Sequence, residues 1–144
     1  MKLNYLHAIQ RLRPHAKVAL VGGMGYSNIQ WGTETPIPVG ELNVALEAAQ
    51  VEQDRIDARN ILKKERAIAV ADIKVTTSLG RTFDGDEDSQ ERMARAIMIS
   101  QLTGITSTTW TLADNSVTTV TLAELSEALA LAGQQQAILW PIQE

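Results

Sequence analysis

The 144-residue sequence contains no cysteine and only two histidines, His7 and His15. The lack of cysteine excludes structural disulfides, thiolate metal sites and a cysteine nucleophile. The histidines stand on either side of Pro14, whereas a two-histidine metal site needs both rings on one face with a carboxylate nearby. We therefore expect solvated histidines and no metal or other cofactor.

Aromatic residues and long apolar runs are also scarce. Aromatic side chains make up 4% of the sequence, so the core must consist mainly of aliphatic side chains. The few large fillers are Trp31, Phe83, Trp110 and Trp140. No apolar run reaches the length of about 18 residues that a membrane helix requires, and the first residues lack the apolar stretch of a signal peptide. We expect a chain made in the cytoplasm, with no signal-directed export and no membrane partner.

Positive charge does not dominate either, since 13 Lys and Arg stand against 17 Asp and Glu for a net charge of −4. Nucleic-acid binding draws much of its affinity from cationic side chains that neutralise phosphates, so a nucleic-acid partner is not expected. Apolar residues at 44% and charged residues at 21% are ordinary for a globular protein with a buried core.

Proline and glycine are absent from residues 41–73, which are rich in strong helix formers. This predicts a spacer helix of about 33 residues, roughly 50 Å long. Its apolar residues recur at a spacing near 3.5, with interruptions at Arg55 and at the Glu65-Arg66 pair. They are Val44, Ala48, Val51, Ala58, Leu62, Ala69 and Ile73. Such a seam either associates with copies of itself, as a dimer or trimer, or lies on its own domain.

Residues 1–38 predict a small domain made of a helix and a hairpin. A helical stripe ends at Pro14, and strands over 17–21 and 26–31 flank a glycine-rich turn. The extended connector at Pro36 and Pro38 lies near Trp31, which either docks in a groove of another protein or closes this core. We select six candidate partner-contact residues: Trp31, Pro36, Ile37, Pro38, Val51 and Leu62.

Residues 74–144 predict two successive hairpin-helix units. The first is a hairpin over 75–83 and a helix over 89–103, with a capping box formed by Asp88 and Glu91. The second is a hairpin over 108–121, followed by a helix capped by Thr121. We expect an α+β fold in which the two hairpins form one antiparallel sheet with both helices on one face. The predicted domains are 1–38, a linker helix over 39–73, and 74–144.

No chemical motif is complete. Asp84, Asp86 and Asp88 have the alternate spacing that begins a calcium loop, but the glycine and glutamate that such a loop needs further on are missing. The glycines over 22–25 follow a predicted strand, but no helix is predicted after them, as a phosphate-binding loop would require. A hydrolase would need clustered carboxylates, for which Asp84, Asp86 and Asp114 are the candidates. We expect a protein that is not an enzyme.

Several short motifs resemble an uncharacterised domain that is common in tailed-bacteriophage genomes, beside tail-fibre and baseplate genes. The resemblance covers about residues 73–140, and its motifs are Gly80–Asp84, Asp88–Met93, Trp110–Asn115, Glu124-Leu125 and Trp140. Upstream, Leu12-Arg13-Pro14, Tyr26–Trp31 and Pro38–Leu42 are similar to small tail-fibre-associated and tail-fibre-assembly proteins.

The resemblance implies a structural protein of the virion tail, made in the host cytoplasm. Its expected partners are tail-fibre or baseplate proteins, and we expect it to form a homo-oligomer. An assembly chaperone that leaves before the particle matures is the alternative. The family's motifs carry no known catalytic residue, so no site transfers with them.

Overall fold

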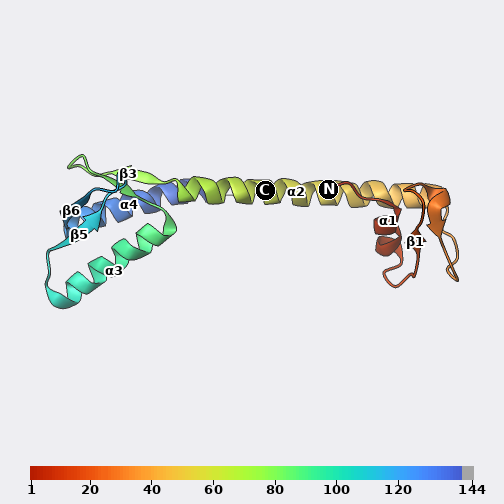
Figure 1. Ribbon diagram of the computed structural model, residues 1–144, viewed down its shortest axis with the longest axis horizontal. Coiled ribbons are helices and arrows are strands. Elements are labelled where there is room, and N and C mark those ends of the chain that lie inside the picture. The colour runs from red at the N-terminus through yellow and green to blue at the C-terminus, as the bar shows by residue number, and fades with distance from the viewer. Residues whose placement is uncertain (141–144) are drawn as a thin grey trace. The chain divides into compact units, whose positions relative to one another are not determined.

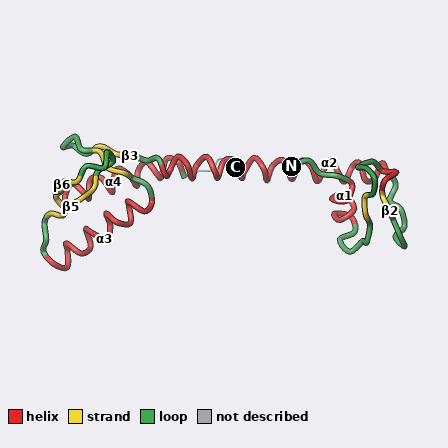
Figure 2. The backbone as a smooth tube through the Cα atoms, viewed as in Figure 1, coloured by secondary structure: helices red, strands yellow, loops and turns green. Residues whose placement is uncertain are grey.

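The computed structural model describes residues 1–140 and shows an α+β fold, which confirms the predicted class. Within these residues the strands form three separate two-stranded antiparallel sheets (Figures 1 and 2). The chain divides into two compact units, Met1–Ile61 and Leu62–Glu144. Helix α2, Val39–Ala71, contributes its first part to unit 1 and its last part to unit 2. The predicted division into three domains stays a prediction.

Unit 1 begins with helix α1, Tyr5–Leu12, which ends before Pro14 as predicted. The Asn4 side chain caps this helix by accepting a hydrogen bond from the Leu6 amide at 3.0 Å. The Asn4 amide in turn donates to His7 Nδ1 at 3.1 Å, which completes a capping box. His7 therefore takes part in the helix cap and is not simply solvated.

The hairpin of unit 1 is shorter than predicted. Strand β1, Ala19–Leu20, pairs with β2, Ile29–Gln30, and the residues just before β2 form the 3₁₀ turn η1, Tyr26–Asn28. Asn28 explains the difference, because its side chain donates to the Val21 carbonyl at 3.0 Å and accepts from the Gly25 amide at 3.2 Å. Such local bonds stabilise a turn in competition with strand pairing.

The core of unit 1 lies between α1, the hairpin and the start of α2. Its buried members are Ala8, Ile9, Ile29, Ile37, Leu42 and Ala45. Tyr26 packs at its margin, with its ring 6.2 Å from those of both Tyr5 and Trp31. Leu42, Ala45 and the similarly buried Ala49 have the spacing of one helix face, so α2 joins this unit through that face.

Unit 2 contains two hairpins that do not form the predicted four-stranded sheet. Strands β3, Lys74–Thr76, and β4, Thr82–Asp84, form one sheet, and β5, Ser107–Thr111, and β6, Val117–Thr121, form another. One backbone hydrogen bond, from the Ala113 amide to the Thr82 carbonyl at 3.0 Å, joins the two hairpins. Ala113 lies beyond the end of β5, where the chain already turns, so no ladder continues from this bond.

Two helices complete unit 2. Helix α3, Glu87–Thr103, is capped by Asp86 and not by the predicted Asp88, because the Asp86 side chain accepts from the Ser89 amide. It ends at Gly104, whose left-handed backbone (φ 74°) suits glycine. Helix α4, Leu122–Leu139, starts at the predicted Thr121 cap and continues through Gly133.

The core of unit 2 lies where α4 packs on α3 and on strands β3 and β6. Its fully buried large side chains are Phe83, Met93, Val120 and Leu125. Val70, near the end of α2, is buried in the same core.

Candidate functional site

The acidic residues that were candidates for chemistry have local structural contacts. Asp84 forms an exposed ion pair with Lys74 at 3.3 Å, and Asp86 caps α3. Asp114 accepts from the amide and the hydroxyl of Ser116 in the β5–β6 turn, and these bonds lower the pKa of its carboxyl. Within residues 1–140, no three His, Asp or Glu side chains gather closely enough to hold a metal ion.

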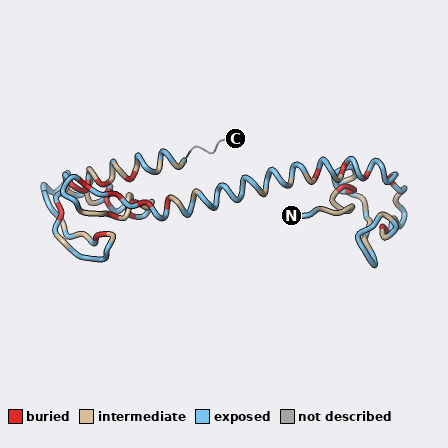
Figure 3. Tube along the Cα trace, turned by 90° about the horizontal axis from the view of Figure 1, so that it is seen from above, coloured by how far each residue is buried: buried red, intermediate tan, exposed pale blue. Residues whose placement is uncertain are grey.

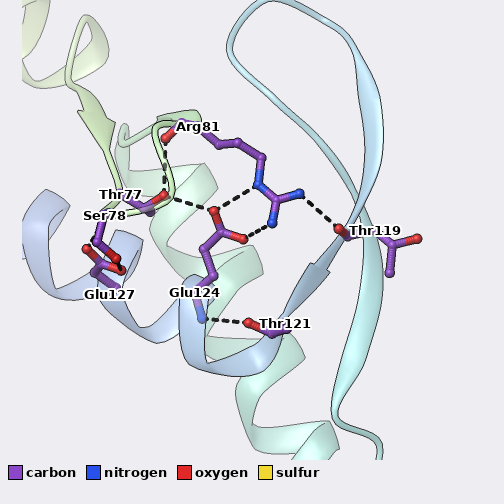
Figure 4. A network of polar contacts seen from close by, with 7 residues as sticks. All are labelled: Thr77, Ser78, Arg81, Thr119, Thr121, Glu124 and Glu127. Carbon is purple, nitrogen blue, oxygen red and sulfur yellow. Dashed lines mark hydrogen bonds and ion pairs between the residues drawn. The ribbon is translucent and has the colours of Figure 1, made fainter.

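A buried charge network around Glu124 connects the β3–β4 turn to the start of α4 (Figure 4). The Glu124 side chain, 3% exposed, accepts from Arg81 Nε at 2.9 Å and forms an ion pair with Arg81 Nη2. Thr77 Oγ1 donates to the same carboxylate at 2.8 Å, and Arg81 Nη1 donates to the Thr119 carbonyl at 3.1 Å. The donors and acceptors of this network are paired with one another and the carboxylate is buried. The network therefore holds the β3–β4 turn against α4 and β6.

Sequence reasoning did not identify this network. The pattern placed Glu124 at the third helical position of a capping motif, where the side chain would normally lie at the surface. The sequence offers one possible partner for a buried Glu124 carboxylate, Arg81 in the β3–β4 turn, but the two residues are 43 positions apart. A contact at that separation depends on tertiary packing and does not appear in local sequence patterns.

Unit 2 also has a cavity of about 380 Å³ between the end of α2 and the start of α3. Its lining combines cationic Lys63 and Arg66 with the acidic residues 86–88. The Arg66 guanidinium lies 4.8 Å from the centre of the Trp140 ring, a cation–π arrangement. Three acidic and two basic side chains line this cavity, so neither sign of charge is concentrated there.

Helix α2 exposes much of its length (Figure 3, pale blue along the middle of this helix), including several large apolar side chains. Val44 is 69% exposed, Val51 is 71% exposed and Leu62 is 47% exposed. At about 100° of rotation per residue, Val44 and Val51 lie roughly opposite Leu42 and Ala49, which α2 buries in its own unit. The first part of the predicted seam is therefore on the side of α2 that unit 1 leaves uncovered. The prediction for Ile73 is wrong, because this residue lies beyond the end of α2 and is buried in the core of unit 2.

The six predicted partner-contact residues have different environments. Pro36, Pro38, Val51 and Leu62 are exposed, and Trp31 is half-buried against Tyr26. The prediction for Ile37 is wrong, because its side chain is only 2% exposed and packs in the core of unit 1. The two prolines turn it inward, since the alternation of an extended segment places residue 37 on the face opposite residues 36 and 38.

Exposed apolar residues also occur beside the seam. Ile61 and Ile68 flank it and are 56% and 63% exposed, whereas Ile56 lies further around the helix and is 40% exposed. Within residues 1–140, no helix has both the length and the apolar character needed to cross a membrane. Where exposed apolar side chains form one contiguous patch, they typically mark a surface that binds another protein.

A family model described as "Domain of unknown function (DUF4376)" matches residues 50–139, which is more than half of the chain. The match begins within α2 and includes every strand and helix of unit 2. The comparisons with curated proteins and with solved structures give no match. The exposed middle of α2 is thus part of the matched domain, and the chain belongs to the DUF4376 family.

Proposed function

We propose that this chain is a structural protein of a bacteriophage tail that binds near the tail fibre or baseplate. It has no enzymatic role and acts through protein contacts. The single observation that carries the proposal is the apolar surface of α2, which is exposed at Val44, Val51 and Leu62. Keeping such residues at the surface favours aggregation unless a protein partner covers them.

The assignment to a tail rests on the resemblance of residues 73–140, and of three shorter upstream motifs, to proteins encoded beside tail-fibre and baseplate genes. Exposed apolar residues on α2 are compatible with this assignment, since a tail component must present contact surfaces to neighbouring subunits. Pro36 and Pro38 add a stiff exposed segment next to the half-buried Trp31, which offers a second contact area.

The protein composition of purified phage particles tests the proposal. If the chain is a tail component, mass spectrometry detects it at a constant ratio to the fibre and baseplate proteins in every preparation. Its presence in infected cells together with its absence from mature particles would overturn the proposal in favour of an assembly chaperone. Absence from both tail intermediates and particles would contradict either role.

A further inference from the structure

The exposed seam of α2 follows a strict heptad, which becomes clear when its polar members are included. From Val44 onward, steps of four and three residues alternate without interruption. Within α2, the seam extended by these polar positions consists of Val44, Ala48, Val51, Arg55, Ala58, Leu62, Glu65 and Ala69. Ile73, which would break the alternation, lies beyond α2 and is buried. This alternation is the pattern by which one helix packs along another in a coiled coil. A second helix therefore fits this seam, and the positions of Arg55 and Glu65 determine its direction.

A parallel partner copy would bring like charges together. In a parallel pair each seam residue faces its own counterpart, so Arg55 would face Arg55 and Glu65 would face Glu65. At the flank, Glu47 of one copy would approach Glu52 of the other. Each of these like-charge contacts is unfavourable in the partly dry centre or margin of a coiled coil. They outnumber the attractive flank contact of the parallel pair, between Asp54 of one copy and Arg59 of the other.

An antiparallel partner copy brings opposite charges together. When Arg55 of one copy faces Glu65 of the other, the two-fold axis passes near residue 60, and the same contact forms twice. The neighbouring layers then become Val51 against Ala69 and Ala58 against Leu62. A heptad has two core positions, a and d. Each of the three pairings joins an a position of one copy to a d position of the other, as an antiparallel pair requires.

The flanking positions favour the same direction. In this register Glu52 of one copy lies near Arg66 of the other, again twice. Glu52 already binds Arg55 of its own helix at 2.9 Å, and that pair is exposed. A carboxylate has enough acceptor sites to serve both arginines. Arg59 would approach its own copy at the axis, and its long exposed side chain can turn away into solvent.

We propose that two copies of this chain associate through α2 as an antiparallel dimer in which Arg55 of each copy faces Glu65 of the other. The inference rests on the proposed function only in taking α2 as a protein-contact surface. A dimer of this kind is closed and two-fold symmetric, whereas a symmetric trimer would require parallel helices.

Engineered cysteines test the direction, because the chain has none of its own. Two full-length variants, Ala58→Cys and Leu62→Cys, are mixed under mild oxidation, with a mass tag on one of them. The proposal predicts a disulfide that joins the two different variants. Neither variant alone should link to itself, because an offset of four residues moves the matching cysteines about 6 Å apart along the axis.

Other results would overturn the proposal. Self-linking of Ala58→Cys would establish a parallel pair, and a chain that stays monomeric by light scattering would exclude pairing through α2. Neither result would affect the detection of the chain in phage particles, so failure of this inference is distinguishable from failure of the proposed function.

Charge exchange supplies an independent test. Arg55→Glu should weaken dimerisation at least about tenfold, because it turns two attractive contacts into two repulsive ones. The double variant Arg55→Glu/Glu65→Arg should regain most of this loss. If Arg55→Glu leaves the dimer affinity unchanged, the proposed register is wrong, because in that register residue 55 of one copy always faces residue 65 of the other.

Discussion

At the scale of single residues, Glu124 combines deep burial with a full set of hydrogen bonds. Glu124→Gln replaces one carboxylate oxygen with an amide group that cannot accept from Arg81. We expect a loss of about 1–3 kcal/mol in the free energy of unfolding, measured by urea denaturation. The matched control is Asp84→Asn, which breaks an exposed pair and should cost less than about 0.5 kcal/mol. Equal losses for the two variants would contradict a special role for the Glu124 network.

Changing each of two glycines of unit 2 to alanine should alter the stability of the fold in opposite directions. A Cβ at Gly85 would lie 2.5 Å from Ile73 Cγ2 and 3.0 Å from Ala132 Cβ, so Gly85→Ala should destabilise the fold by about 1–3 kcal/mol. A Cβ at Gly133 of α4 meets nothing within 4 Å. Gly133→Ala should therefore stabilise the helix by about 0.5–1 kcal/mol. Thermal unfolding of both variants measures the difference, and a shift of the same sign in both would be inconsistent with this packing.

The β5–β6 turn should show a local dependence on pH. The Ser116 hydroxyl and amide lower the pKa of Asp114 in the folded protein, so the unfolded chain binds the proton more tightly. The stability that Asp114 contributes is complete above the ordinary aspartate pKa, and it is lost as pH falls through the lower folded value. Ser116→Ala should raise the pKa of Asp114, as followed by NMR titration of its carboxyl carbon. An unchanged pKa would show that the hydroxyl is not the main cause.

At the scale of secondary-structure elements, the sequence predicts the helices well. The helix predicted over 41–73 is observed as Val39–Ala71, so it begins and ends two residues earlier than predicted. Its existence follows from a long segment free of glycine and proline, which has few alternatives to helix. The caps at Thr121 and Gly104 follow from their residue types. Local signals of this kind need no knowledge of tertiary structure.

The errors occur where a competing local bond or a distant contact decides the structure. The Asn28 side chain replaces part of a predicted strand with a turn, and Asp86 takes the cap predicted at Asp88. Each hairpin of unit 2 forms its own two-stranded sheet, and the local pattern of strand residues does not show which hairpins join. Of the candidate contact residues, Val51 and Leu62 are exposed and their contact role stays a prediction, whereas Ile37 is buried and its prediction is wrong.

Asn115 provides a prediction at the same scale, because it has a positive φ of 65° in the β5–β6 turn. Asn115→Gly should leave the stability of the hairpin nearly unchanged, since glycine adopts this conformation freely. Asn115→Val should cost about 1–2 kcal/mol, because a β-branched side chain is strained in the left-handed region. Urea denaturation of the two variants compares them, and equal stabilities would argue against a left-handed residue in the turn.

At the scale of the whole molecule, the proposed function depends on whether the exposed seam of α2 holds proteins together. The double variant Val51→Ser/Leu62→Ser removes apolar surface from the seam without changing either core, since both side chains are exposed. It should keep the helix content of the wild type by circular dichroism. The control is Ile56→Ser, which lies on α2 away from the seam and is also exposed.

The most direct measurement is the molar mass of the full-length chain in solution, obtained by light scattering over a range of concentrations. The wild type and Ile56→Ser should both reach the mass of a dimer, while Val51→Ser/Leu62→Ser should remain at the 15.7 kDa of one chain. A wild type that stays at this single-chain mass at every concentration, or a seam variant that dimerises as well as the wild type, would contradict self-association through this face of α2.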